Sequence, residues 1–235
     1  MMREKFSVVI ITKNEEKFIS DAISSALFAD EIVILDSGST DRTKEISKSL
    51  NVKFYFSTWE GFGPQKNKAI GLAKNSWVFV LDSDERISED LQEEILENLV
   101  KPSAKGFLVP RLNNFFGKNI KTCGLYPDYS IRLFNKNYGK FNDVPVHESV
   151  SVNGKVEKLN SPLIHFAYEN VSEFRKKQNL YASLHQSNKS FIRAILSSIW
   201  AFIKIYFLKF GIVEGWRGLV IASVYAKYSF DKYKK

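Results

Sequence analysis

The chain has 235 residues, 44% of them hydrophobic, and a formal net charge of +8 at pH 7. That length and apolar content suffice for one sizeable hydrophobic core but are lean for two. Cys123 is the only cysteine, which excludes an internal disulfide and agrees with a reducing compartment such as the cytoplasm.

Strands and helices alternate through the first hundred residues. A β-branched run at Phe6–Thr12 predicts a strand, and apolar residues at helical spacing follow over 19–26. The same signals predict further strands at 31–35, 52–56 and 77–81, and helices after Asp41, over 64–73 and over 88–99. Apolar strands that alternate with helices indicate a parallel sheet covered on both faces. The apolar stretch before Lys13 has only seven residues, too few for a signal peptide.

Polar residues stand where three of these strands end. Thr12, Asp36 and Asp82 fall at the carboxyl ends of strands, where parallel α/β sheets bind ligands. In Asp82-Ser83-Asp84 we expect the two carboxylates to share one face of the strand, with Ser83 turned away, and to converge on a hard cation. Mg²⁺ or Mn²⁺ held by few carboxylates completes its shell with phosphate oxygens and water, so the pattern favours a diphosphate ligand. The plainer alternative is a solvated turn or a helix cap.

Several stretches of the chain resemble a known family. They are VVIITKNE at 8–15, LDSGSTD at 35–41, WEGFGPQKN at 59–67 and LDSDE at 81–85. Their order and spacing resemble those of an inverting glycosyltransferase of family 2, which has the GT-A fold. Three more stretches are similar to the branch of bacterial lipopolysaccharide core glucosyltransferases: residues 126–128, 131–134 and 146–148. The similarity extends over about residues 6–170.

The resemblance implies an α/β fold: a GT-A nucleotide-diphospho-sugar transferase with a mixed, mainly parallel sheet and a helical C-terminal extension. We expect residues 1–170 to form the transferase domain, with a nucleotide half to about residue 105 and an acceptor half over 106–170. Residues 171–235 form the extension, whose first helix we expect Ser172 to cap. Loops of the acceptor half are expected to line the acceptor groove.

The grip on the nucleotide base is assigned by the resemblance. It places Thr12 and Asn14 along the base and implies that Asp36 accepts the imide N–H. This favours uracil over cytosine, because cytosine has no hydrogen at that atom. The alternative for Asp36 is a turn residue ahead of Gly38.

Other polar residues are expected nearer the phosphates and the sugar. Lys66 and Asn67 lie near the start of a predicted helix, from which they can approach the phosphates or ribose; a solvated helix face is the alternative. Asp82 is implied to contact the nucleotide sugar. Arg132 alternates with apolar neighbours and can face the cleft, where a guanidinium suits a phosphate or an acidic acceptor. For Arg132 the alternative is a surface position on a strand.

An inverting displacement needs one base for the acceptor hydroxyl, and the resemblance assigns this role to Glu148. The charge development resembles that of glycosidases, but no carboxylate nucleophile is required. His147 is the rival, since histidine suits proton transfer near neutrality. Adjacent strand residues face opposite ways, so we expect one of the pair in the site. An ordinary strand with a polar edge is the alternative for both.

The metal site implied by the resemblance consists of Asp84, Asp82 and His165, with Mg²⁺ or Mn²⁺ as the ion. His165 stands in an apolar, strand-like run. It resembles the C-terminal histidine that completes the metal site of many GT-A enzymes. A core histidine whose polar atoms are satisfied by neighbours is the alternative.

The basic excess of the chain lies entirely in the C-terminal extension. Residues 171–235 contain twelve Lys or Arg against three Asp or Glu, a net charge of +9, so the first 170 residues carry −1. Basic segments of helical length that are rich in aromatic and aliphatic residues indicate helices on a membrane surface, beside anionic lipid. Their uncharged stretches of about ten residues are too short to span a bilayer. Helices docked on the catalytic core are the alternative, and no nucleic-acid-binding signature is present.

Together these features predict a cytoplasmic glycosyltransferase, peripheral on the inner face of the cytoplasmic membrane. The preferred reaction moves glucose from UDP-glucose to a sugar hydroxyl of a lipid-linked saccharide, in an envelope glycan such as the lipopolysaccharide core. Alternatives change the acceptor to a polyprenyl phosphate or a protein side chain, or replace the enzyme by a catalytically silent membrane-surface scaffold. A nucleotide-dependent dehydrogenase does not fit, because no Gly-x-Gly-x-x-Gly follows the first strand.

Overall fold

The computed structural model of the protein describes residues 3–143, 148–184 and 190–234. Its contacts divide the chain into two compact units. Unit 1 contains residues 1–111 and 129–165, and unit 2 contains residues 112–128 and 166–235. The predicted division at residue 170, with residues 106–170 as an acceptor half, remains a prediction about domains.

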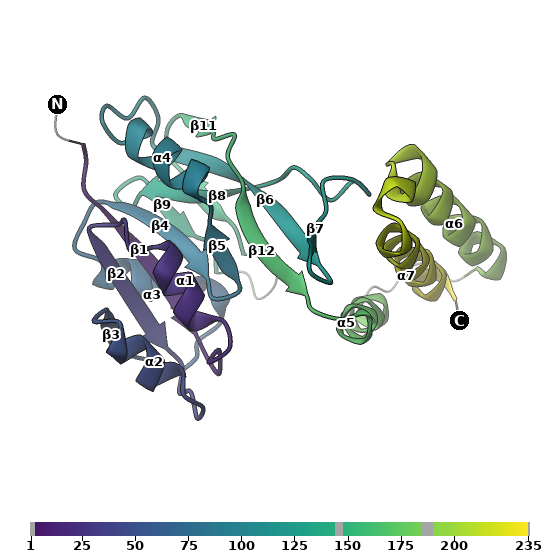
Figure 1. Ribbon diagram of the computed structural model, residues 1–235, viewed down its shortest axis with the longest axis horizontal. Helices are drawn as coiled ribbons and strands as arrows, with labels where there is room; N and C mark the ends of the chain where they lie inside the picture. Colours follow the sequence, from purple (N-terminus) through teal and green to yellow (C-terminus); the bar gives the residue numbers. More distant parts are fainter. Residues whose placement is uncertain (1–2, 144–147, 185–189, 235) are drawn as a thin grey trace. The chain divides into compact units, whose positions relative to one another are not determined.

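Unit 1 is built on the parallel strands that the sequence predicts (Figure 1). β1 (Phe6–Thr12) lies between β2 (Glu31–Asp36) and β4 (Trp77–Asp82), and β3 (Lys53–Phe56) pairs with β2. All three pairings are parallel. The central three strands are almost wholly buried, as expected for apolar runs that lie between two layers of helices.

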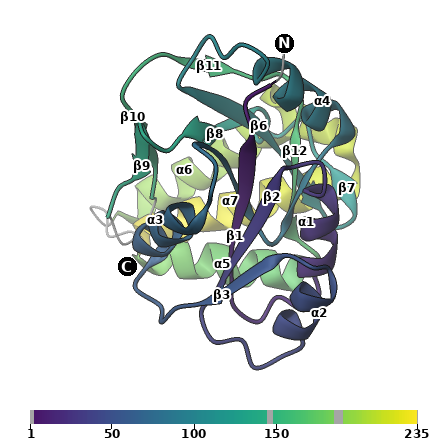
Figure 2. The same cartoon turned by 90° about the vertical axis from the view of Figure 1, so that its left-hand side faces the viewer.

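Helices cover both faces of these strands. They are α1 (Ile19–Ser25), α2 (Thr43–Ser49), α3 (Phe62–Leu72) and α4 (Glu89–Asn98). Val8 and Ile10 of β1 point into a core that α1, α2 and α4 complete, whereas Val9 points into a second core with α3. Figure 2 shows α3 on one side of β1 and β2, and α1 and α2 on the other. Ser88 caps α4 by accepting a hydrogen bond from the Leu91 N–H.

The rest of the sheet makes it mixed. After β4 the strand order is β8, β6, β12, β5, and β11 also pairs with β6. These strands are β5 (Glu85–Ile87), β6 (Gly106–Phe115), β8 (Asp128–Asn135), β11 (Val156–Lys158) and β12 (Leu163–Tyr168). β8 runs antiparallel to β4, and β5 antiparallel to β12. A separate antiparallel pair is formed by β9 (Gly139–Phe141) and β10 (Val150–Val152).

Unit 2 holds the C-terminal helices. Its elements are β7 (Lys118–Asn119), α5 (Val171–Leu184), α6 (Phe191–Ile203), the π-helical segment η1 (Lys204–Leu208), the 3₁₀ segment η2 (Gly211–Glu214) and α7 (Trp216–Tyr233). Phe115 and Phe116 pack with Phe174 of α5 and with Ile221 and Val224 of α7 in one aromatic-rich core. The segment 112–128 thus shares a core with the C-terminal extension.

The start of α5 differs from the prediction. The helix begins at Val171, one residue before the expected cap, Ser172. Asn170 takes the capping role, because its Oδ1 accepts a hydrogen bond of 2.9 Å from the Glu173 N–H. Asn and Ser are both good caps, so composition alone could not choose between neighbouring candidates.

α6 and η1 form a longer continuous helix than the sequence analysis expected. The segment Phe191–Leu208 has 18 residues, a mean hydropathy of 1.7 and only 6% of its residues buried. By length and composition this helix could cross a membrane. The helix is longer than the uncharged stretch of about ten residues because it includes Arg193 and Lys204 near its two ends; that it does not span the bilayer stays a prediction.

Candidate active site

The candidate site lies in unit 1, at the carboxyl ends of the parallel strands. Strand register pairs Thr12 with Asp36 and Ile11 with Asp82, so the three predicted polar residues meet at one edge of the sheet. Beside that edge is a cavity of about 490 Å³, which Lys66, Asp82, Arg132 and Glu148 help to line. The ligand site that the sequence predicts at this edge of the sheet therefore coincides with a cavity.

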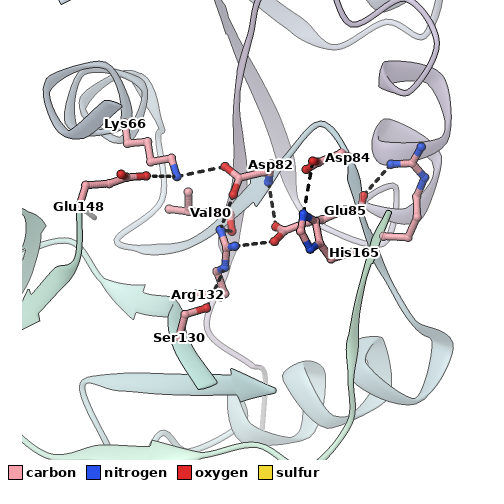
Figure 3. A network of polar contacts seen from close by, with 10 residues as sticks. Lys66, Val80, Asp82, Asp84, Glu85, Ser130, Arg132, Glu148 and His165 are labelled. Atoms are coloured by element: carbon pink, nitrogen blue, oxygen red, sulfur yellow. Dashed lines mark hydrogen bonds and ion pairs between the residues drawn. The ribbon is translucent and has the colours of Figure 1, made fainter. Parts of the chain in front are cut away.

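Asp82 binds two cations from different elements. Its Oδ1 lies 3.0 Å from Lys66 Nζ of α3, and its Oδ2 accepts a hydrogen bond of 3.1 Å from Arg132 Nη1 of β8 (Figure 3). Burial opposes ionisation of this carboxyl, but Arg132 and Lys66 outweigh it and hold the pKa of Asp82 well below its usual range. Asp82 is thus a fixed anion that positions both cations.

Arg132 is held on its other side by Glu85. Arg132 Nη2 donates to Glu85 Oε1, and Glu85 Oε2 accepts a hydrogen bond of 3.1 Å from the Asp82 N–H. Arg132 is 6% exposed and Glu85 fully buried. Burial raises the pKa of Glu85. Burial alone would lower the pKa of Arg132, but the charges of Glu85 and Asp82 outweigh it, so that this pKa lies above its usual value. The alternative of a surface strand position for Arg132 is therefore wrong: its guanidinium is a buried, oriented group.

Lys66 connects Asp82 to the predicted base. Its Nζ lies 3.0 Å from Glu148 Oε1 as well as 3.0 Å from Asp82 Oδ1, and it lies 5.3 Å from the centre of the Phe141 ring. Lys66 is only 5% exposed, so a solvated helix face is excluded for it. The ion pair brings Glu148 to the same cavity as Asp82, although 66 positions separate them in the chain.

Asp84 faces a different group from Asp82. β4 ends at Asp82, and Ser83-Asp84 form a turn, so the alternation of side chains along a strand no longer applies. Asp84 Oδ2 lies 3.4 Å from His165 Nε2 of β12 (Figure 3). Burial and the charge of Asp84 together raise the pKa of Glu15, so a further carboxyl lies nearby.

This arrangement is compatible with a hard divalent cation. Among the described residues, no three His, Cys, Asp or Glu side chains form a group that could enclose a metal ion. Asp84 and His165 nevertheless offer one carboxylate and one imidazole nitrogen side by side, and Asp84 is 39% exposed. An ion held by so few protein ligands keeps coordination positions for phosphate oxygens and water. Asp82, which the resemblance also assigns to the ion, contacts Lys66 and Arg132 instead.

The residues predicted around the nucleotide base lie in one loop cluster. Asp36 Oδ2 accepts hydrogen bonds of 2.9 Å from both the Gly38 and Ser39 N–H groups, so its turn role is real. Asn14 Oδ1 accepts a hydrogen bond of 2.8 Å from the Thr40 N–H. Within the described part of the chain, the buried Oγ1 of Thr12 has no hydrogen-bond partner. A buried hydroxyl without a partner at the carboxyl end of a strand suits a group that receives a ligand.

Asn67 has a structural task. Its Nδ2 donates to the Phe141 carbonyl at 3.0 Å, and its Oδ1 accepts from the Phe141 N–H at 2.9 Å. The side chain therefore ties α3 to β9, and its predicted contact with the nucleotide stays a prediction. His147, the rival base, lies outside the described residues.

Two residues of the site escaped the sequence analysis. Glu85 belongs to the stretch LDSDE, and it shares one face of a short strand with the apolar Ile87, which marks it as a buried carboxyl. Arg111 of β6 also lines the cavity, and nothing in its local sequence distinguishes it from a surface arginine. Both lie on strands whose pairing the sequence did not reveal.

Comparison with known proteins agrees with this geometry. Residues 7–151 match the model of glycosyl transferase family 2. The chain belongs to that family. It is 30% identical over 255 residues to an uncharacterized glycosyltransferase of Rickettsia bellii, covering 100% of this chain and 87% of that protein. It is 29% identical over 240 residues to the lipopolysaccharide core biosynthesis glycosyltransferase LpsC of Rhizobium meliloti, covering 95% of this chain and 88% of LpsC.

The fold has a counterpart among solved structures. The structure of Staphylococcus aureus TarS residues 1–349 in complex with UDP-GlcNAc has a TM-score of 0.51 and 16% sequence identity, and covers 97% of this chain and 89% of that one. At this identity the similarity concerns the fold alone. The family 2 glycosyltransferase therefore has the GT-A fold with a mixed, mainly parallel sheet and C-terminal helices, as predicted.

Proposed function

We propose that this family 2 glycosyltransferase moves glucose from UDP-glucose to a sugar hydroxyl of a lipid-linked envelope glycan, such as the lipopolysaccharide core, with inversion. One observation supports this most: Lys66 joins Glu148 to Asp82 inside one cavity, at the edge where parallel sheets bind nucleotides. The name of LpsC supports the envelope glycan, and the TarS complex with UDP-GlcNAc supports a UDP-linked donor.

The loop cluster at the ends of β1 and β2 would hold the base. Asp36 is buried and acceptor-only when ionised, so it can receive the imide N–H of uracil in addition to its own turn. Thr12 has a hydroxyl ready for a polar partner, and Asn14 is fixed nearby through Thr40. These contacts supply recognition of uridine rather than cytidine.

The charge balance favours a divalent cation with the donor. When ionised, Asp82, Glu85 and Glu148 outnumber Lys66 and Arg132 by one charge. A diphosphate would enter a site with no net positive charge of its own. Mg²⁺ or Mn²⁺, when bound, neutralises the departing diphosphate. Asp84 and His165 are the residues that would hold it, and Asp84 adds a fourth acidic side chain to the argument for a cation.

Glu148 would act as the base. The acceptor oxygen attacks the anomeric carbon, its proton passes to the Glu148 carboxylate, and the bond between the anomeric carbon and the diphosphate oxygen breaks. In this structure Lys66 donates a hydrogen bond to one oxygen of Glu148. Diphosphate oxygens compete for Lys66, so arrival of the donor would free Glu148 for the acceptor hydroxyl. Lys66 would then link donor binding to activation of the base.

The test is release of UDP by the purified protein offered a panel of nucleotide sugars, with Mg²⁺, Mn²⁺ or a chelator and a lipid-linked saccharide acceptor. We expect turnover of UDP-glucose that stops with the chelator and in Asp84→Ala. Glu148→Gln should lower turnover by about 10²–10⁴-fold without loss of donor binding. Glu157→Gln serves as the matched control, because Glu157 lies on β11, outside the cavity, where its carboxylate pairs with Lys155.

The outcomes separate the alternatives. Full activity of Glu148→Gln on a polyprenyl phosphate would assign a phosphate acceptor, which needs no deprotonation. Turnover with another nucleotide sugar would correct the donor. Absence of any metal-dependent nucleotide-sugar binding would remove the enzyme proposal and leave a scaffold.

We further propose a cytoplasmic location, peripheral on the inner face of the cytoplasmic membrane. The C-terminal extension has a net charge of +9 and many exposed apolar side chains, and both support this location. Cell fractionation should recover the protein with membranes, and a high-salt wash should release much of it. Recovery in the soluble fraction at low salt would contradict the proposal.

A further inference from the structure

One face of α6 is apolar and exposed along its whole length. The exposed side chains recur in neighbouring pairs, one turn apart, and we call them the outer face: Phe191, Ile192, Ile195, Leu196, Ile199 and Trp200. Ile192 is 70% exposed, Phe191 63% and Trp200 57%. At about 100° per residue they cover roughly half of the helix circumference. Isolated exposed apolar residues are ordinary, but a continuous stripe of this kind marks a surface that binds something.

Cations border the outer face, and carboxylates are absent from it. At the same angular spacing, Arg193 and Lys204 both fall just beyond the edge that Trp200 marks, and both are exposed. The segment Phe191–Leu208 contains these two cations and no Asp or Glu. On the other side, Lys227 of α7 lines a groove of about 510 Å³ together with Ile199 and Phe202. An apolar stripe with cations along both borders matches the surface of an anionic bilayer, where long basic side chains reach the headgroups.

A crossing of the bilayer by α6 conflicts with its neighbour α7. The two helices run side by side: Ser190 N–H donates to the Tyr233 carbonyl at 3.0 Å at one end, and Lys227 lies beside Ile199, near the middle of α6. If α6 crossed, it would carry Lys227 and its partner Asp231 into the centre of the hydrocarbon. Eighteen residues also reach only about 27 Å, short of the roughly 30 Å hydrocarbon core.

A second copy of the chain is a poorer occupant of the outer face. Self-docking of two such faces would bring Arg193 and Lys204 of one copy toward the same cations of the other, with no carboxylate on the helix to compensate. Charge complementarity therefore favours a negatively charged surface.

We propose that the outer face of α6 lies in the plane of an anionic lipid bilayer, with Arg193, Lys204 and Lys227 at the level of the headgroups. The inference deepens the proposed membrane location by naming the surface, its orientation and the lipid charge. It rests on that location and not on the identity of donor or acceptor. Vesicle binding and metal-dependent UDP release are measured separately, so failure of one is distinguishable from failure of the other.

The first experiment is cosedimentation of the full chain with vesicles of phosphatidylcholine, with and without phosphatidylglycerol. We expect binding only to the anionic vesicles. Arg193→Gln combined with Lys204→Gln should weaken it about 30-fold, because each basic residue near the surface contributes about fivefold. Leu196→Glu combined with Trp200→Glu should abolish binding. Leu180→Glu is the matched control, because Leu180 is 57% exposed on α5 of the same unit but lies outside the outer face.

The second experiment measures depth, using a fluorophore attached in turn at residues 192, 199 and 207 and quenchers at known positions in the lipid. An in-plane helix gives equal depths at the three positions. A deepest position at 199 would mean that α6 crosses the bilayer and would overturn the proposal. Residue 207 lies in η1, beyond the end of α6, and Phe207 is 53% exposed there, so this position extends the measurement to the far end of the helix.

Other outcomes would also overturn it. Equal binding to neutral and anionic vesicles, or unchanged binding after loss of both cations, would remove the role of lipid charge. A stable dimer in lipid-free solution that Leu196→Glu with Trp200→Glu converts to a monomer would make the outer face an interface between copies. Melting curves by circular dichroism show whether each variant still folds. If the Glu variants unfold, the cation pair and the depth profile still decide the question.

Discussion

Arg132 lies between two carboxylates and has almost no contact with solvent. Asp82 and Glu85 each bind one of its terminal nitrogens, and Ser130 Oγ accepts a hydrogen bond of 3.2 Å from its Nε. A guanidinium so fixed presents its charge in one direction only. The buried pair with Glu85 therefore orients Arg132 and, through the Asp82 N–H, also fixes the end of β4.

Loss of one partner of this buried pair should be costly. Glu85→Gln is expected to lower the free energy of unfolding by about 3 kcal/mol, because it leaves charge in the interior without its partner. Urea unfolding followed by circular dichroism measures the effect. Glu157→Gln, in an exposed pair, should unfold at the same urea concentration as the wild type. Equal midpoints for Glu85→Gln and the control would mean that Asp82 alone satisfies Arg132.

Asp82 predicts how the site responds to acid. Its pKa is lowered from the ordinary 3.8 in the folded state, so its ion pairs stabilise the fold fully above that pH. The stabilisation decreases as the pH falls below 3.8 toward the lower folded value, because in that range the unfolded chain binds the proton and the folded protein does not. The difference in unfolding free energy between the wild type and Asp82→Asn should therefore be constant from about pH 7 to about pH 5 and shrink at about pH 3. A difference that stays constant down to about pH 3 would show that the pKa of Asp82 is not lowered in the folded state.

The residues of the site were only partly readable from the sequence. Asp36 and Asp82 could be found because each ends a strongly apolar strand. Glu148 and His165 came from the family resemblance, since no local pattern joins them to Asp82 or Asp84. Which carboxylate meets which cation depends on side-chain directions, and the change from strand to turn after Asp82 altered those directions.

At the scale of elements, α3 packs closely against β9 and the residue that follows it, Asn142. A Cβ added at Gly63 would lie 2.1 Å from the Asn142 carbonyl oxygen, so only glycine permits this approach. The approach places Lys66, one turn further along α3, beside Asp82 and Glu148. The position of the lysine thus depends on a glycine that never contacts it.

Two substitutions within α3 test this. Gly63→Ala should destabilise the protein by about 1–3 kcal/mol and reduce UDP release, because the helix must move away from β9. Gly71→Ala is the matched control: nothing lies within 4 Å of its added Cβ, and the better helix former should stabilise the protein by about 0.5–1 kcal/mol. Thermal unfolding and UDP release are measured for both. Similar effects of the two substitutions would contradict the steric argument.

Elements were predictable where the pattern was long. β1, β2 and β4 are apolar runs of six or seven residues, and the structure confirms them nearly residue by residue. β5, β9, β10 and β11 have three residues each, too few for a period of two to be recognised. Their places in the sheets depend on contacts between distant segments, which local sequence does not specify.

At the scale of the molecule, the two units offer surfaces for different ligands. The cavity lined by Asp82 and Lys66 lies in unit 1, and the outer face of α6 lies in unit 2. Binding energy stabilises the part of the fold that makes the contacts. Each ligand should therefore slow hydrogen exchange only in the unit that it contacts.

Hydrogen exchange measured with each ligand distinguishes protection of unit 1 from protection of unit 2. UDP with Mn²⁺ should slow exchange at the ends of β1, β2 and β4 and leave α6 unchanged. Anionic vesicles should slow exchange in α6 and η1 and leave those strand ends unchanged. Asp84→Ala should lose the first effect only, and Leu196→Glu with Trp200→Glu the second only. Protection of both regions by either ligand alone would show that the two sites are coupled.

The aromatic core of unit 2 also sets an order for biosynthesis. Phe115 and Phe116 pack against Phe174 and against Ile221 near the end of the chain. At the usual speed of translation, the hundred or so residues between Phe116 and Ile221 take roughly 5–20 s to make. During that interval Phe115 and Phe116 of the nascent protein lack the side chains of α7 against which they pack. A ribosome stalled before residue 221 should expose them to chaperones, although the parallel strands β1, β2 and β4 have already emerged.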